Sequence, residues 1–200
     1  EAAIGADMVA KEEAEFIETA ETLVTTSCCP SFVDYIEKHQ KDFVVNISPA
    51  LSPMSELAKK IRESNEKIVF IGPCIAKKME AYKIGKIDYA LTFEELASLF
   101  AAKGIEPSQL ENLEVEGSFD GWNFAQSGGV ANAVVNLCKK SLTIEKMDGL
   151  SEGNELFKKA KTGKIDLIEG MACEGGCICG PGIMVNPLVA KANLKKMGIK

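Results

Sequence analysis

The sequence predicts an α/β fold in which mostly parallel strands are flanked by helices. Short apolar runs of strand type alternate with segments of helical period, which is typical of strand–helix–strand units around a parallel sheet. Three of the strand-like runs are followed directly by a loop that carries cysteine. Because sites in open α/β sheets lie at the carboxyl ends of strands, we expect the three loops to converge at one edge.

The first elements follow from apolar spacing and from one proline. Apolar residues recur at helical spacing over about 8–22, which predicts an amphipathic helix. A short extended piece then leads to TSCCP at 26–30, and Pro30 opens a second helix, since proline is favoured at the first helical position. The apolar run FVVNIS at 43–48 predicts a short strand.

Start and stop signals define the remaining elements. Ser52 followed by Pro53 predicts a helix start, and Thr92 with Glu95 forms a capping box whose helix ends near Gly104. The expected order is a helix at 51–64, a strand at 67–71, a helix at 76–83, a strand at 88–91, a helix from 92 to about 104, a loop-rich acidic stretch at 105–127, a helix at 128–140, a strand at 141–147, a helix at 154–163 and a strand at 164–170.

Length and composition limit the classes of function. A chain of 200 residues with 46% hydrophobic residues can bury a sizeable core. The loop-rich stretch is the expected linker between two lobes, 1–105 with the TSCCP and GPC loops and 106–200 with the MACEGGC loop. The net charge of −6, without a basic tract, argues against nucleic acid as a partner.

The chain shows no targeting or membrane segment. No apolar run approaches the roughly 18–20 residues of a membrane helix, so no membrane partner is expected. The acidic opening EAAIGADMVAKEEAEF lacks the apolar core of a signal peptide and lacks an initiator Met. We therefore expect a cytoplasmic location and a piece of a longer protein.

Seven cysteines carry the chemical information. An odd number in a chain of this length does not indicate a disulfide framework, so metal-bound or reactive thiols in a reducing compartment are expected. In MACEGGC, two thiols stand four residues apart across two glycines, which let the backbone pass close to a bulky inorganic cluster. Iron–sulfur clusters are held by cysteine thiolates, and a zinc site is the alternative.

Three loops resemble the signature loops of iron-only (FeFe) hydrogenases. They are TSCCP, the segment Pro73-Cys74-Ile75-Ala76-Lys77-Lys78-Met79-Glu80, and EGMACEGGC at 169–177. GADMVAKEEAEF, the NIS…LSP stretch, DYALTFEELA and FAQSGGV are similar to the family's intervening segments. The resemblance covers about 5–185 and implies a two-lobed H-cluster domain with its cluster in the cleft between the lobes.

The resemblance implies an H-cluster, in which a 4Fe-4S cubane is joined through one cysteine sulfur to a two-iron unit with carbonyl, cyanide and a bridging dithiolate. The implied cubane ligands are Cys29, Cys74, Cys173 and Cys177, and Cys177 would also bridge to the two-iron unit. The two adjacent cysteines then have separate roles, because neighbours in an extended segment point opposite ways.

The resemblance also implies a proton relay and a pocket. Cys28 would be the terminal proton donor, with Glu13 and Ser48 carrying protons outward, since relay groups must lie within hydrogen-bond reach of one another. The family's second relay glutamate aligns near Phe16 without gaps, with Glu15 adjacent, which leaves the outer relay open. Around the two-iron unit, Lys77 would hold a cyanide by a charge-assisted hydrogen bond, and the other implied contacts are Pro73, Met171 and Phe124.

The implied activity is an oxidoreductase reaction of an anaerobe, H2 ⇌ 2H⁺ + 2e⁻, with a ferredoxin-type carrier or a missing ferredoxin-like domain as electron partner. The chain departs from the family's pattern at TSCCPSF, at Gly72, and at Gly180-Pro181-Gly182 with the extra Cys179. It also lacks the family's preceding segment, so the two-iron unit can be absent. Three alternatives stay open: a slow sensory domain, a non-catalytic 4Fe-4S protein and a structural zinc fold.

Several residues have competing interpretations. Cys138 lies in a helical pattern and is expected to be a small core residue, and His39 is expected at the surface. Cys179 is either a spare thiol or a packing residue beside the cluster. Glu13 is a relay group or an exposed acid, and Lys77 is a cofactor contact or part of a solvated face. The glycines at 128 and 129 favour close helix packing over a phosphate-binding loop.

Overall fold

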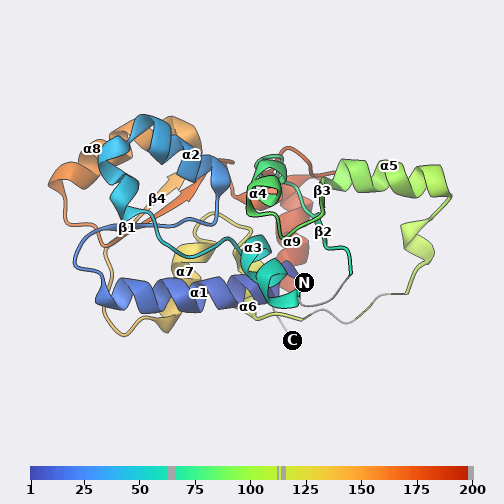
Figure 1. Cartoon of the computed structure of the whole chain (residues 1–200), viewed down its shortest axis with the longest axis horizontal. Coiled ribbons are helices and arrows are strands. Elements are labelled where there is room, and N and C mark those ends of the chain that lie inside the picture. The colour runs from blue at the N-terminus through green and yellow to red at the C-terminus, as the bar shows by residue number, and fades with distance from the viewer. Residues whose placement is uncertain (63–65, 112, 114–115, 198–200) are drawn as a thin grey trace.

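The computed structural model describes residues 1–62, 66–111, 113 and 116–197, which form an α/β fold with two parallel sheets (Figure 1). The larger sheet has the strand order β1-β5-β4 and the smaller one pairs β2 with β3. All of these pairings are parallel. The predicted fold class is therefore confirmed.

The elements follow one another in an alternating order. The first half contains α1 (Ala2–Thr19), β1 (Val24–Thr25), α2 (Pro30–His39), η1 (Lys41–Asn46), α3 (Pro53–Ile61), β2 (Val69–Ile71), α4 (Ala76–Ile84), β3 (Tyr89–Leu91) and α5 (Phe93–Lys103). The second half contains η2 (Pro107–Gln109), α6 (Phe119–Asn123), α7 (Gly129–Leu137), β4 (Ile144–Asp148), η3 (Leu150–Glu152), α8 (Gly153–Thr162), β5 (Leu167–Met171), η4 (Cys177–Cys179) and α9 (Pro187–Met197).

The central strand β5 is buried along its whole length because helices cover both faces of its sheet (Figure 1). Successive strand residues point to opposite faces. Leu167 and Met171 enter the α1–α7 core, whose buried members also include Ala10, Ile17, Cys28, Phe124, Val130 and Val134. Ile168 enters the α2–α8 core, whose members also include Cys29, Phe32, Ile36, Met147 and Phe157.

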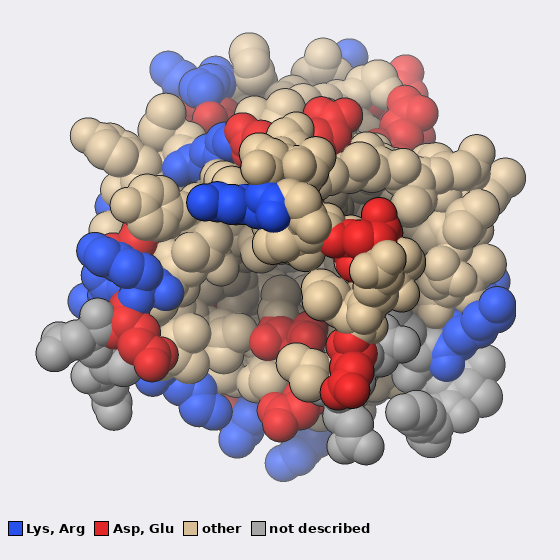
Figure 2. All heavy atoms as spheres, turned by 90° about the vertical axis from the view of Figure 1, so that its right-hand side faces the viewer, with Lys and Arg blue, Asp and Glu red and all other residues tan. Residues whose placement is uncertain are grey.

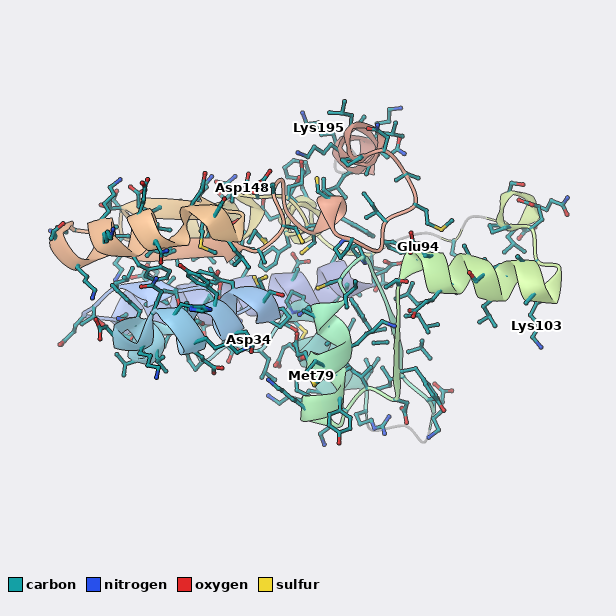
Figure 3. All side chains as sticks on the ribbon, turned by 90° about the horizontal axis from the view of Figure 1, so that it is seen from above. Asp34, Met79, Glu94, Lys103, Asp148 and Lys195 are labelled. Atoms are coloured by element: carbon teal, nitrogen blue, oxygen red, sulfur yellow. The ribbon has the colours of Figure 1, made fainter. Side chains whose placement is uncertain are left out.

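The smaller sheet packs one face against α3 and α4. Ile68, Phe70 and Ala90 contact a third cluster of buried residues, which consists of Met54, Ala58, Ala81 and Ile87. Helix α5 leaves the end of β3 and extends away from the rest of the chain, with no buried residue of its own (Figures 1 and 3). Its predicted capping box is present, because Thr92 and Glu95 exchange side-chain and backbone hydrogen bonds.

Two of the expected boundaries are wrong. The helix predicted over 8–22 begins six residues earlier, in α1. The strand predicted at 43–48 is the 3-10 helix η1, followed by one bridge between Ile47 and Thr25. Val45 is 89% exposed, whereas Phe43 is buried against Phe157. The 3-10 turn buries the Phe43 ring without forming a strand. The neighbouring strand β1 has only two residues, so it cannot pair with a longer strand at 43–48.

The other expected elements are confirmed, and most of their ends lie within one to three residues of the expected ones. Residues 63 and 64 of the expected helix at 51–64 lie outside the described residues. The C-terminal α9 had no sequence prediction. Within the expected linker, α6 packs on α1, where Ser118 donates a backbone hydrogen bond to Asp7. The division into lobes 1–105 and 106–200 stays a prediction, and β1 of the first pairs with β5 of the second.

Basic and acidic side chains are scattered over the face seen from the end of α5 (Figure 2). Within the described residues, no helix combines the length and the apolar character that a bilayer crossing needs.

The contact between α1 and α3 gives a test of the packing. A Cβ at Gly5 would lie 2.1 Å from the Pro53 carbonyl oxygen, so the helix can approach only without a side chain there. Alanine in place of glycine stabilises a helix by about 0.5–1 kcal/mol on propensity alone. We expect Gly5→Ala instead to destabilise the chain by about 1–3 kcal/mol, measured by urea unfolding. A net gain in stability would contradict this packing.

Candidate metal centre

The TSCCP loop separates its two thiols by a simple backbone rule. It follows β1 directly, and Cys29 is the extended N-cap residue of α2 with Pro30 at the first helical position. Both thiols are buried. Cys28 belongs to the α1–α7 core and Cys29 to the α2–α8 core, so the neighbours point to opposite sides of the loop. The expected divergence of the two cysteines is therefore present.

The Cys74 loop follows β2 and precedes α4. Its backbone is tied to β3 by the Gly72 N–H, which donates to the Leu91 carbonyl at 3.0 Å. The Pro73 carbonyl accepts from the Gly182 N–H at 2.8 Å, which connects this loop to the segment after the third cysteine group. A Cβ at Gly72 would meet the Phe70 ring at 2.6 Å, so a larger residue there requires Phe70 to move.

The third loop follows β5 and turns on two glycines. Gly175 and Gly176 have φ values of +82° and +89°, in the left-handed region that favours glycine. A Cβ on Gly176 would lie 2.5 Å from the Ser127 nitrogen, so this backbone must also pack closely on the segment before α7. The Ile178 N–H donates to the Ala125 carbonyl at 3.0 Å in the same contact.

The thiols expected as ligands lie near one another, because those of Cys29, Cys74 and Cys173 each affect the pKa of Cys177. Burial raises the pKa of Cys177 to about 12, and the charges of Cys29, Cys74 and Cys173 contribute further. Burial raises the pKa of Cys29 and Cys173 too, again with a contribution from Cys74. Such thiols stay protonated without a cation, and a bound metal cluster would replace those protons with positive charge.

The convergence differs from the expected one in its geometry. Cys28, Cys29, Cys173 and Cys177 follow strands of the larger sheet, whereas Cys74 follows a strand of the smaller one. The thiols therefore meet between two sheets and not at one sheet edge. All seven cysteines are free. No group of three or more His, Cys, Asp or Glu in the described residues is placed to hold a single metal ion. This finding does not bear on a cubane, because each thiolate of a cubane binds a different iron and the thiols need not surround a single ion.

Glu13 is buried beside Cys28, so its interpretation as an exposed acid is wrong. Burial raises its pKa to about 7, against the lowering effects of the Ser27 N–H and the Ser48 side chain. The Ser27 N–H donates to Oε1 at 3.4 Å, and Oε2 has no hydrogen-bond partner among the described residues. The structure thus brings Cys28, Glu13 and Ser48 together, and it leaves one carboxyl oxygen available.

Lys77 is also buried, so its interpretation as part of a solvated face is wrong. Its Nζ donates to the Cys28 carbonyl at 3.1 Å and to Glu80 Oε2 at 2.7 Å. Glu80 Oε1 accepts from Ser52 and Ser55, which ties the TSCCP loop to α3 and α4. Glu80 was not among the expected site residues, although its place three residues after Lys77 on a helix could have indicated the pair.

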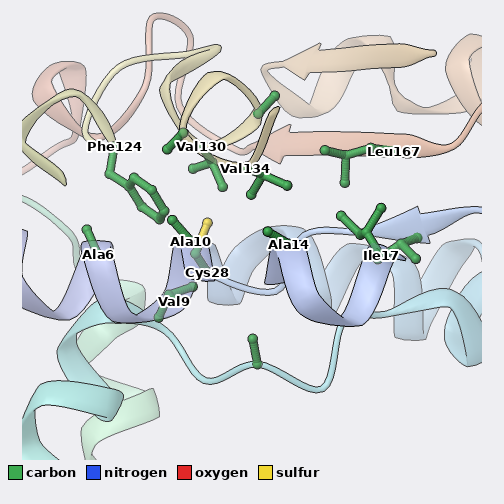
Figure 4. Close-up of a cluster of buried hydrophobic side chains, with 14 of the residues drawn as sticks. Ala6, Val9, Ala10, Ala14, Ile17, Cys28, Phe124, Val130, Val134 and Leu167 are labelled. Atoms are coloured by element: carbon green, nitrogen blue, oxygen red, sulfur yellow. The ribbon is translucent and has the colours of Figure 1, made fainter. Parts of the chain in front are cut away.

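Phe124 and Met171 are buried in the α1–α7 core together with Cys28. Figure 4 shows the Phe124 ring beside Ala10 and the Cys28 sulfur. The pocket-wall positions implied by the resemblance are therefore close to the expected proton donor. Their apolar surface limits the access of water to this thiol.

Glu169 is a buried acid that the sequence analysis missed. Its two carboxyl oxygens accept from the Gly128 and Ala131 N–H groups at 2.6 and 2.7 Å, at the N-terminus of α7. An acidic side chain therefore occupies the helix end that a phosphate would otherwise take. A Cβ on Gly129 would lie 1.9 Å from the Asn123 carbonyl oxygen. The glycines serve helix packing, as expected.

Cys138, Cys179 and His39 lie outside the expected ligand set. Cys138 packs against the α1–α7 core, and His39 is exposed beside the Tyr35 ring, as expected for both. Cys179 lies against Gly175, and its charge contributes to the raised pKa of Cys173. Both interpretations of Cys179 remain compatible with that position.

A family model of the iron only hydrogenase large subunit, C-terminal domain, matches residues 1–181. The chain belongs to this family. It is 30% identical to the periplasmic Fe hydrogenase large subunit of Nitratidesulfovibrio vulgaris, over 84% of this chain and 53% of that protein. It is 28% identical to iron hydrogenase 1 of Clostridium pasteurianum, over 98% of this chain and 44% of that protein. The chain thus spans about half the length of these relatives.

Solved structures agree with the fold of this iron-only hydrogenase domain. A FeFe-hydrogenase structure concerned with oxygen damage to the 2Fe subcluster superposes with a TM-score of 0.80 at 19% identity, over 96% of this chain and 73% of that one. An apo FeFe-hydrogenase from Chlamydomonas reinhardtii gives 0.75 at 20% identity, over 95% and 72%. A shorter match is the cytosolic Fe-S cluster assembly factor NAR1 of Vanderwaltozyma polyspora, 30% identical over 40% of this chain and 16% of that protein.

The buried acid Glu13 gives a test by pH. Its pKa in the folded chain is about 7, above the ordinary value of 4.5, so folding favours the neutral form. The contribution of Glu13 to stability is therefore greatest below about pH 4.5, falls by about 3 kcal/mol as the pH rises from about 4.5 to 7, and levels off above 7. We expect Glu13→Gln to remove this part of the pH dependence in urea unfolding between pH 4 and 8.

The adjacent and exposed Glu12 provides the matched control, since Glu12→Gln changes the same charge on the same helix. We expect the pH dependence of Glu12→Gln to follow that of the unmodified chain. If Glu13→Gln also follows the unmodified chain, Glu13 is not held neutral by burial.

Proposed function

We propose that this chain is a hydrogenase domain that holds a 4Fe-4S cubane on Cys29, Cys74, Cys173 and Cys177 and a two-iron unit bridged through Cys177. The observation that supports it most directly is the convergence of the three cysteine loops: β1 pairs with β5, and the Gly182 N–H after the third loop donates to the Pro73 carbonyl of the second. The Cys74 thiol accordingly contributes to the raised pKa of Cys29, Cys173 and Cys177. The donor set fits the cluster, because thiolates are the usual ligands of a cubane. When bound, the H-cluster would supply the low-valent iron at which hydrogen is split into two protons and two electrons.

The chain's own residues would manage protons and water. Cys28 would exchange a proton at its Sγ atom, and Glu13 would exchange one at its carboxyl group, where a pKa of about 7 suits transfer in both directions near neutral pH. Ser48 would continue the relay. Phe124 and Met171 would exclude water on the apolar side of Cys28.

The contacts proposed for the two-iron unit are Pro73, Lys77, Met171 and Phe124. Burial and the Cys28 carbonyl hold the Lys77 ammonium close to the TSCCP loop, which supports its role toward an anionic ligand such as cyanide. Glu80 shares this charge, so the two residues act as a pair. An ammonium that is already oriented loses little freedom when it donates to a further partner.

A non-catalytic iron–sulfur role is the second candidate, favoured by the match to an Fe-S cluster assembly factor. The buried Cys28 beside Glu13 favours hydrogen chemistry, because a cubane alone requires neither group. A sensory domain with slow turnover would keep both. The ferredoxin-type electron carrier, the cytoplasmic location and the two-lobe division are proposed on the sequence, and the Nitratidesulfovibrio relative is named as periplasmic.

Iron content tests the ligand set. We expect the anaerobically purified chain, reconstituted with iron and sulfide, to hold about four irons. Single changes of Cys29, Cys74, Cys173 or Cys177 to Ser are expected to reduce the iron content and the visible charge-transfer absorption. Cys138→Ser is the matched control and is expected to retain both, because the Cys138 thiol contacts the Ala14 carbonyl of α1 and no other cysteine affects its pKa. Bound zinc without iron would contradict the proposal.

Infrared spectroscopy tests the two-iron unit. After maturation with that unit, we expect sharp bands from metal-bound carbonyl and cyanide ligands, which are properties of the cofactor. Cys28→Ala is expected to keep these bands and to lose about 10²–10⁴-fold in hydrogen turnover, since it removes a proton-transfer group. Four irons without the bands would instead indicate a bare cubane.

The turnover rate separates enzyme from sensor. A rate within about tenfold of a catalytic relative corresponds to about 1.4 kcal/mol in the barrier and would remove the sensory alternative.

A further inference from the structure

A cavity of about 450 Å³ lies between α2, α4 and the loop after η1. Asp34 on α2 and Met79 on α4, which are labelled in Figure 3, belong to its lining. Its inner wall includes Ser27 and Ser48. A space of this size with polar groups on its wall can hold several water molecules.

The same two serines separate this cavity from Glu13. The Ser27 N–H donates to Glu13 Oε1, while the Ser27 hydroxyl donates to the Ala50 carbonyl at 2.5 Å. The Ser48 side chain also interacts with Glu13 and is 4% exposed. Glu13 thus lies directly behind the cavity wall, and one of its oxygens has no hydrogen-bond partner among the described residues.

The other direction from Glu13, along α1, offers no ionisable relay group at the next turn. Phe16 stands three residues later, and a phenyl ring can neither accept nor donate a proton in such a chain. Phe16 does not line the cavity. Glu12 and Glu15, on the same helix, are exposed. Glu169 contributes to the raised pKa of Glu13, but both of its oxygens accept N–H groups at the start of α7.

We infer that protons pass between Glu13 and solvent through the α2–α4 cavity, by way of the Ser48 hydroxyl and water, with Asp34 and Glu37 as the acceptors at its outer lining. This inference rests on the proposed function. Glu80 also lines the cavity, but Ser52, Ser55 and Lys77 occupy its oxygens. Asp34 Oδ2 accepts from Lys38 at 3.0 Å, and Lys83 lies 3.9 Å from Asp34 Oδ1, so two positive charges lie beside this acceptor, whereas Glu37 on the same helix is exposed. Along this path the proton passes from one oxygen to the next, so only O–H bonds break and form.

The test follows hydrogen–deuterium exchange of the Glu13 carboxyl group by infrared spectroscopy. The band is assigned by difference against Glu13→Gln, at about pH 6, below the Glu13 pKa of about 7. The chain is used with its cubane, before any two-iron unit is supplied, so the result does not depend on hydrogen turnover. We expect Val33→Phe, which fills the cavity from α2, to slow exchange by about tenfold or more, equivalent to about 1.4 kcal/mol of added barrier.

Val135→Phe makes the same change on α7, away from the cavity, and is expected to exchange at the rate of the unmodified chain. If Val33→Phe fails to fold, Met79→Trp at the exposed rim replaces it, with Met184→Trp as its control. The two methionines are 58% and 59% exposed. Unchanged exchange in a folded cavity variant overturns the inference, even if the carbonyl and cyanide bands support the proposed function. Slowed exchange supports it, even if those bands are absent.

Discussion

A single backbone ladder two residues long brings the TSCCP loop to the third cysteine loop. Val24 and Thr25 of β1 pair in parallel with Leu167 and Ile168 of β5, and the Thr26 N–H continues the ladder to the Ile168 carbonyl at 3.0 Å. Because the two strands are parallel, the segments that follow them leave the sheet at the same end. The approach of Cys28 and Cys29 to Cys173 and Cys177 depends on this short pairing and on the close packing that surrounds it.

Two buried acids show how the same side chain serves two purposes. Glu169 accepts from two backbone N–H groups of α7, so each oxygen is satisfied and the carboxyl group connects β5 to a helix. Glu13 accepts one long hydrogen bond and keeps one oxygen without a partner among the described residues. A buried polar atom without a partner costs stability, and such atoms persist where they serve chemistry. The contrast supports a chemical purpose for Glu13.

Particular residues show how much of the site could be predicted from the sequence. Proline after the second cysteine predicted the start of α2, and the extended backbone before it predicted that Cys28 and Cys29 diverge. The run 43–48 was mistaken for a strand, because apolar residues in a row do not reveal that a single ring, Phe43, is buried. Glu80 and Glu169 were missed, because each is defined by partners distant in the chain or by a helix end.

The sequence by itself determined the alternation of elements, the helix caps and the three cysteine motifs, because these depend on local spacing and backbone preference. Only the tertiary structure decided that the motifs meet between two sheets and that Glu13 and Lys77 are buried. Burial depends on which helices pack over a residue, and long-range pairing decides that. The same acidic stretch at the start of the chain therefore contains exposed Glu12 and fully buried Glu13, one residue apart.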